Sequence, residues 1–123
     1  MTNEAADAVA KRTDGKAEVL QGTLDLMVLQ TLESMGPQHG YAIAARLEQV
    51  SAGALQLNMG TLYPALMRLE QRGRIKGAWN TTETNRRARY YVLTAAGRRQ
   101  LAKEKRVWDQ MAGIIQALLR GQA

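Results

Sequence analysis

The chain has 123 residues, a formal net charge of +6, a single histidine and no cysteine. This length predicts one domain, and the composition excludes a disulfide framework and a zinc site built from Cys and His. No apolar run approaches the roughly 18 residues that span a bilayer, and the N-terminus lacks the apolar core of a signal peptide. We therefore expect a cytoplasmic protein with no membrane partner.

Basic residues are concentrated in the second half of the chain. Twelve of the 17 lysines and arginines lie between Arg68 and Arg106, together with only three acidic residues. A basic half of this kind suits a polyanion such as nucleic acid. The charge pattern alone also fits a solvated basic surface, so the elements that carry the charge must decide between the two interpretations.

The N-terminal part begins with residues 1–18, which are rich in alanine and charge and show no lasting apolar period. This pattern predicts a disordered or frayed tail. From Thr23, whose hydroxyl can cap a helix, apolar residues recur at helical spacing until Gly36 and Pro37. We expect the first helix of the domain here.

A second helix is predicted to begin near Gly40 and to end at residues 51–53. His39 immediately precedes it, and a capping or local hydrogen-bonding role is favoured for this residue over that of a catalytic base. Residues 55–57 alternate between apolar and polar types, which predicts a very short strand.

The third helix is predicted from the capping residues at 58–61 to Gly73, with a proline in or near its first turn. At 100° per residue its leucines fall on one side. The opposite side carries Gly60, Tyr63, Pro64, Met67 and Arg68. Small residues let a helix N-terminus approach a phosphate, and Tyr63 would either contact DNA or pack against the following hairpin.

Two strand-like runs follow at residues 75–80 and 88–93, joined by a polar connection. Trp79 and Tyr91 are predicted to lie in the core and to fix this hairpin to the helices. A flexible basic tip is typical of an element that contacts phosphates or the minor groove, with a solubilising loop as the alternative. The candidate DNA contacts of the hairpin are Lys76, Asn85, Arg86, Arg87 and Arg89.

A last helix is predicted from about Ala95 to Leu119, and at 1.5 Å per residue it would be about 38 Å long. A helix of this length projects beyond a small core, and an apolar stripe on its free part needs a partner. The simplest partner is a second copy of the chain. The stripe approximates an a/d pattern and consists of Leu101, Trp108, Met111, Ile115 and Leu118.

Helix, helix, short strand, helix and basic hairpin follow one another as in a winged helix-turn-helix, a mainly α fold with a small β-hairpin. The predicted organisation is a tail at 1–18, a DNA-binding domain at 19–94 and a dimerisation helix at 95–123. The third helix would enter the major groove and the hairpin, or wing, would follow the duplex. No paired acids, activated nucleophile or Gly-rich phosphate loop indicates an enzyme, a cofactor or a metal.

Several motifs in the same order resemble the PadR family of bacterial winged-helix regulators, over about residues 20 to 119. In the first two helices they are Gly22-Thr23-Leu24-Asp25 and Gly36-Pro37-Gln38-His39-Gly40-Tyr41-Ala42-Ile43. In the third helix they are Gly60-Thr61-Leu62-Tyr63-Pro64-Ala65-Leu66 and Arg68-Leu69-Glu70. After it come Trp79, Asn85-Arg86-Arg87-Ala88-Arg89-Tyr90-Tyr91, and Leu93-Thr94 with Gly97.

The resemblance implies a homodimeric repressor that binds inverted-repeat operators in double-stranded DNA. It assigns the DNA contacts to Tyr41, Gly60, Thr61, Tyr63, Arg86, Arg87 and Arg89. In relatives with a similarly short C-terminal part, a tryptophan on the dimerisation helix stacks on a flat aromatic effector. Trp108 matches that tryptophan here, and the expected pocket-lining residues near it are Val107, Met111 and Ala112.

Three functions remain open at this stage. The first is a repressor that a planar aromatic ligand releases from DNA, and the second is a repressor without a small-molecule effector, in which Trp108 only packs at the dimer interface. The third is a protein-interaction module that uses the wing or the long helix. Arg86 and Arg87 would be needed for the first two functions and dispensable for the third.

Overall fold

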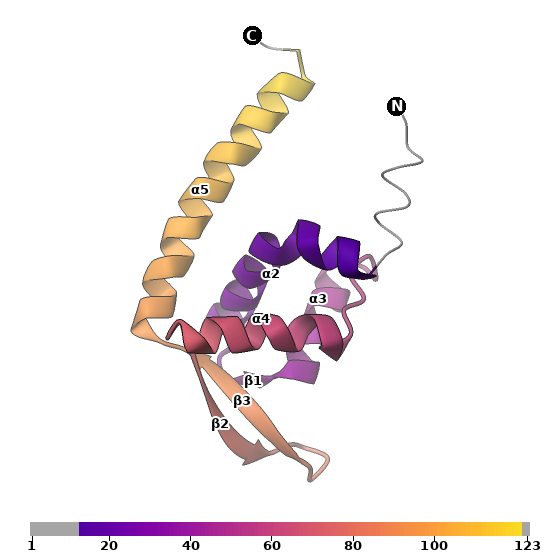
Figure 1. Cartoon of the computed structure of the whole chain (residues 1–123), viewed down its shortest axis with the longest axis vertical. Helices are drawn as coiled ribbons and strands as arrows, with labels where there is room; N and C mark the ends of the chain where they lie inside the picture. The colour runs from indigo at the N-terminus through magenta and orange to yellow at the C-terminus, as the bar shows by residue number, and fades with distance from the viewer. Residues whose placement is uncertain (1–12, 122–123) are drawn as a thin grey trace.

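The computed structural model describes residues 13–121, with side chains from residue 22 onward. Its helices are α2 (Thr13–Met35), α3 (Gly40–Val50), α4 (Met59–Gln71) and α5 (Ala95–Leu119), and its strands are β1 (Gln38–His39), β2 (Ile75–Thr81) and β3 (Arg87–Leu93). Figure 1 shows α2, α3 and α4 packed together, the β2–β3 hairpin below them and α5 rising away. The predicted mainly α fold with a small β-hairpin is confirmed.

The core lies between α2, α3 and α4, and it closes on the base of the sheet. Its side chains are Leu24, Val28, Leu29, Leu32, Ile43, Leu47, Leu62, Ala65, Leu66, Leu69, Ile75, Tyr91, Leu93 and Leu101. Burying one leucine completely stabilises a fold by about 1.5–3 kcal/mol, and Leu62, Leu66 and Leu69 of α4 have no exposed surface. This confirms the predicted inner side of the third helix and holds α4 in one orientation.

The sheet has three antiparallel strands in the order β1-β3-β2. The strand predicted at residues 55–57 is wrong, and the third strand is β1, where Gln38 pairs with Tyr91. Leu57 instead packs against the helical core, so the alternation at 55–57 reflects one-sided burial in a loop.

Side-chain caps begin three of the helices. His39 accepts a hydrogen bond from the Ala42 N–H at α3, as predicted, and Asn58 and Thr94 cap α4 and α5 in the same way. Gly73 follows the end of α4; its φ of +72° suits glycine, and its N–H donates to the Glu70 carbonyl at 2.9 Å. Pro64 lies in the second turn of α4, near the first turn as predicted.

The start of the first helix differs from the prediction. The α2 helix begins at Thr13, so Thr23 lies inside it rather than at its cap, and residues 13–18 of the predicted tail are helical. The rest of that predicted tail lies outside the described residues.

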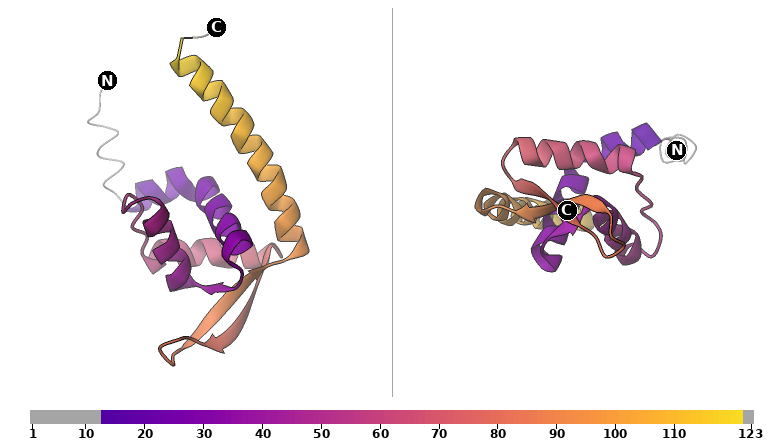
Figure 2. Two further views of the ribbon diagram at one scale, coloured as in Figure 1. Left: turned by 180° about the vertical axis from the view of Figure 1, so that it is seen from behind. Right: turned by 90° about the horizontal axis from the view of Figure 1, so that it is seen from below.

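The α5 helix has the predicted bounds, and its two halves lie in different surroundings. Leu101 is 3% exposed, and Gly97 packs so closely on the Arg74 carbonyl that a Cβ would overlap it. Ion pairs from Arg98 to Glu33 and from Arg74 to Glu104 flank this first half. Beyond it the helix leaves the domain, as the view from behind in Figure 2 shows.

Candidate nucleic-acid interface

The outer face of α4 consists of Gly60, Tyr63, Pro64 and Met67, which are all exposed. Tyr63 is 47% exposed and Met67 57%. The Asn58 side chain accepts a hydrogen bond from the Thr61 N–H at 2.9 Å, and the N–H groups of the first helical residues have no partner within the helix. This end of the helix is therefore suited to an approaching phosphate.

Arg68 was predicted on this face, but the structure gives it another partner. Its Nη2 donates to Oδ1 of Asp25 at 2.8 Å, and Asp25 is only 7% exposed. The pair joins α2 to α4 across the core. Because its charge is neutralised by a buried carboxylate, Arg68 supports the position of α4 and is not part of the outer face.

The wing, the β2–β3 hairpin with its connecting turn, presents its basic residues in different ways. Asn85 adopts a positive φ of 64° at the tip, and Arg86, Arg87 and the predicted contact Lys76 are exposed. The Arg87 guanidinium lies 5.3 Å from the ring centroid of Trp79.

Trp79 is 58% exposed, so its predicted place in the core is wrong, whereas Tyr91, at 3% exposed, is buried as predicted. The physical reason is that β2 leaves the helical domain after Ile75 and Gly77, and the face that buries Ile75 is open to solvent at Trp79. There the indole supports Arg87 in place of core packing.

A hollow of about 560 Å³ separates the wing tip from the start of α3. Tyr41 and His39 line one side, and Arg86 and Arg87 are among the wing residues on the other. Tyr41 is 69% exposed, and the edge of the His39 ring contacts Tyr90 at a centroid distance of 5.2 Å. The predicted contacts Tyr41, Arg86 and Arg87 are thus brought together.

Arg89 differs from the other wing arginines because it is paired. Its Nη2 donates to Oε2 of Glu70 in the last turn of α4, and this carboxylate raises the pKa of Arg89. Burial raises the pKa of the neighbouring Tyr91, and the charges of Tyr63 and Glu70 raise it further. No local sequence pattern indicates this cluster, since the partners come from separate elements.

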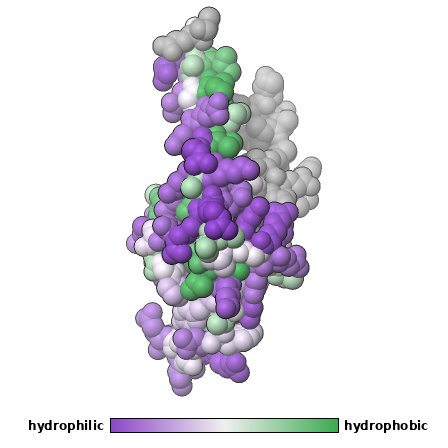
Figure 3. All heavy atoms as spheres, turned by 90° about the vertical axis from the view of Figure 1, so that its left-hand side faces the viewer, coloured by the Kyte–Doolittle hydropathy of each residue, from purple (hydrophilic) through white to green (hydrophobic). Residues whose placement is uncertain are grey.

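The free half of α5 exposes an apolar stripe, part of which is visible at the top of Figure 3. Its members are Val107, Trp108, Met111, Ile114, Ile115, Leu118 and Leu119. Trp108 is 51% exposed. Leu101, which was predicted to belong to the stripe, is buried in the core of its own chain instead.

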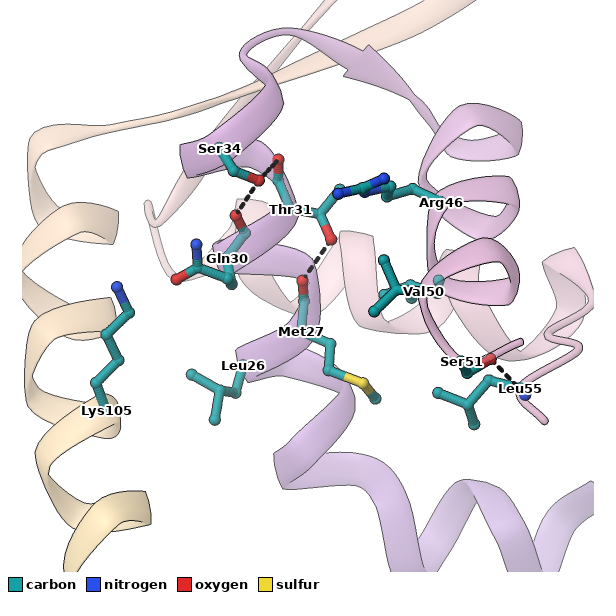
Figure 4. A pocket seen from close by; sticks show the side chains of 11 residues that line it. Leu26, Met27, Gln30, Thr31, Ser34, Arg46, Val50, Ser51, Leu55 and Lys105 are labelled. Atoms are coloured by element: carbon teal, nitrogen blue, oxygen red, sulfur yellow. Dashed lines mark hydrogen bonds between the residues drawn. The ribbon is translucent and has the colours of Figure 1, made fainter. Parts of the chain in front are cut away.

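An apolar groove of about 600 Å³ lies between α2, α3 and α5 (Figure 4). Leu26 and Met27 of α2, Val50 of α3 and Lys105 of α5 line it. The Oε1 atom of Gln30 is buried without a hydrogen-bond partner among the described residues. The sequence did not predict this groove, because α5 contributes to it only through its angle to α2.

Residues 28–103 match the Transcriptional regulator PadR-like family, which is more than half of the chain. The chain belongs to this family. Within residues 13–121, no helix is both long and apolar enough to cross a membrane.

Solved PadR structures have the same fold. The PadR-like transcriptional regulator from Bacillus cereus is 25% identical, with a TM-score of 0.73 over 85% of this chain and 99% of that one. The PadR family regulator from Eggerthella lenta is 28% identical, with a TM-score of 0.72 over 94% of this chain and 96% of that one. The PadR family and these neighbours are transcriptional regulators rather than enzymes, and this chain is a winged-helix transcriptional regulator of the PadR family.

Two sequence relatives are uncharacterized proteins. One, from Lysinibacillus sphaericus, is 23% identical over 86% of this chain and 96% of that protein. The other, a 37.1 kDa protein in a Streptomyces fradiae transposon, is 41% identical over 80 residues, which are 65% of this chain and 21% of that protein. In the second relative, therefore, the PadR-like part is a fraction of a longer chain.

Because Arg68 pairs with the buried Asp25, we expect Arg68→Met to destabilise the fold more than the replacement of an exposed arginine does. Loss of a hydrogen bond to a charged, buried partner lowers the free energy of unfolding by about 1.5–3 kcal/mol, measured by urea denaturation. Arg72→Met, on an exposed arginine of the same helix end, changes it by less than about 0.5 kcal/mol. If Arg68→Met leaves the stability unchanged and weakens the salt dependence of DNA binding, Arg68 contacts DNA as the sequence predicts.

Proposed function

We propose that the protein binds an inverted-repeat operator as a homodimer and represses transcription. The observation that carries this proposal is the pairing of two exposed surfaces, the outer face of α4 and the arginine-bearing wing tip. An α-helix fits the major groove, and a basic hairpin beside it can follow the backbone or the minor groove. A regulator of chromosomal DNA would act in the cytoplasm, as the sequence predicts.

The proposed contacts fall into two groups. Gly60, Thr61 and Tyr63 would meet the duplex from α4, where free N–H groups of the first turn favour a phosphate and the Tyr63 hydroxyl can donate to one. Tyr41, Lys76, Asn85, Arg86 and Arg87 would contact the backbone from the two sides of the wing hollow and from the wing's base. Phosphate contacts of this kind fix the register of the helix without reading sequence.

The homodimer would form through the free half of α5. Its exposed apolar stripe is unlike the solvated surface expected of an isolated helix, and covering it with the same stripe of a second chain gives a closed two-fold pair. Two-fold symmetry would set the two α4 helices on half-sites about one helical turn apart, roughly 10 base pairs.

Trp108 is the proposed ligand-responsive residue. Its indole is half exposed on the stripe, beside Val107 and Met111, so a planar aromatic compound could stack on it at the interface between two chains. In a repressor without an effector, Trp108 would only pack between the chains, and operator release would depend on no compound.

Replacing Arg86 or Arg87 by Ala should weaken binding to any duplex, because each side chain would neutralise a phosphate. The slope of log K against log salt should fall by about 0.9 for each phosphate that the variant no longer neutralises. Arg99→Ala, which removes the same charge from an exposed position on α5, serves as the matched control and should leave the slope unchanged. Fluorescence anisotropy with a random-sequence duplex measures the slope for each of the three variants. Equal slopes in every variant would favour the protein-interaction module.

Ile115→Glu should dissociate the dimer, because it buries an unpaired charge in the proposed interface. Sedimentation equilibrium would then show a monomer with unchanged helical content by circular dichroism. Gln110→Glu, on an exposed position outside the apolar stripe, should remain dimeric. A dimer that tolerates Ile115→Glu would place the interface elsewhere.

Planar aromatic dyes such as proflavine should quench Trp108 fluorescence in a Trp79→Phe background, which removes the other tryptophan of the chain. Stacking on the indole is the physical reason for the expected quenching. An unchanged emission spectrum at high concentration of every dye in the panel would leave the repressor without an effector as the function.

A further inference from the structure

We propose that the Glu70–Arg89 ion pair withholds Arg89 from DNA phosphates and also sets the angle of the wing on α4. Glu70 and Gly77 are then positioning residues for operator discrimination. This inference rests on the proposed DNA-binding function, and it assigns to Arg89 a role opposite to that of Arg86 and Arg87.

The first observation is the ion pair itself. Glu70 lies in the last turn of α4, and Arg89 lies on β3, 19 residues further along the chain. Both side chains are about one-third exposed, at 32% each. Among the ion pairs of the described residues, this one joins α4 to the wing. It therefore links the two surfaces that the proposed function brings to one duplex.

The second observation is the route that the Arg89 side chain takes. A Cβ on Gly77 would lie 2.5 Å from Nε of Arg89 and 2.8 Å from its Cζ. The guanidinium thus crosses β2 where that strand has no side chain, and a larger residue at this position would require the flexible Arg89 side chain to shift. Glycine weakens a strand interior, and a close approach of this kind explains its place here.

The third observation is the surroundings of the pair. The buried Tyr91 lies within electrostatic reach of both Glu70 and Arg89. The charge of Tyr63, from the outer face of α4, also raises the pKa of Tyr91. The ion pair is therefore part of a cluster that extends from the base of the wing to the proposed DNA-contacting helix.

Arg87 provides the contrast within the same strand. It lies two residues from Arg89, hence on the same face of β3, and its guanidinium rests on the exposed Trp79 ring. No ion pair to a carboxylate is formed by Arg86 or Arg87 in the described part of the chain. Two arginines are thus presented to a polyanion and one is held back.

Holding back one arginine affects discrimination more than total affinity. A phosphate contact adds affinity for every sequence alike, whereas base contacts depend on how accurately α4 is placed. An Arg89 freed from Glu70 would add about 0.9 to the salt slope, which corresponds to about a fivefold gain at physiological salt. At the same time the wing would lose its fixed angle on α4.

The test uses the full chain and two duplexes, one selected by the wild-type protein from a random-sequence pool and one with the same bases scrambled. For Glu70→Gln we expect the scrambled duplex to bind about fivefold more tightly, with a salt slope larger by about 0.9. The selected duplex should gain less, so that the ratio of the two affinities falls. Gly77→Ala displaces Arg89 by another route and should have the same effect in protein that circular dichroism shows to be folded.

Two controls separate this mechanism from a change in net charge. Glu33→Gln removes the same charge and frees Arg98 from its ion pair on α2 and α5, away from the wing, and should leave the slope unchanged. In an Arg89→Met background, Glu70→Gln should have no effect on the slope. Arg89→Met alone should also leave it unchanged, because the wild-type arginine contacts no phosphate.

The possible results are distinct. If Glu70→Gln matches Glu33→Gln, Glu70 does not withhold Arg89 from DNA. If Arg89→Met alone lowers the slope by about 0.9, Arg89 is an ordinary phosphate contact. Either result overturns the inference. If the wild-type protein binds DNA with no phosphate-dependent slope and selects no duplex, the proposed function fails and this inference fails with it.

Discussion

Burial of one face of α4 determines which surface the protein can offer to a partner. Leu62, Ala65, Leu66 and Leu69 are all fully buried, so the helix cannot rotate without exposing leucines at a cost of about 1.5–3 kcal/mol each. The Asp25–Arg68 pair adds a polar contact to α2 on the flank of this face. Tyr63 and Met67 are consequently fixed on the outer face of α4, where they are available to contact a partner.

The two extensions of the domain follow from this arrangement. The wing leaves the core after Ile75 and is tied back to α4 through Glu70 and Arg89, so its arginines are placed relative to the outer face of α4. The α5 helix is anchored by Leu101 and Gly97 and then runs free with an apolar stripe. One extension is basic and the other apolar, which suits a regulator that binds DNA at one end and a second chain at the other.

Local signals predicted much of this fold from the sequence. The cap at His39, the stop at Gly73 and the bounds of α5 each depend on residues close in the chain. The errors concern burial and partners that come from distant elements. Trp79 has the alternation of a core residue but lies beyond the end of the helical layer, and Leu101 fits the α5 stripe but contacts the core. The partners of Arg68 and Arg89 lie 43 and 19 residues away and have no pattern to reveal them.

In the proposed function, the outer face of α4 and the wing recognise a particular DNA sequence as a two-fold pair. Titration of the protein into a labelled duplex from upstream of its own gene, with a scrambled duplex as control, tests it most directly. We expect saturable binding to the native duplex alone at physiological salt, with a Kd tighter than about 10⁻⁸ M and two protomers per site. Weak and equal binding to both duplexes, or a single protomer at saturation, would contradict it.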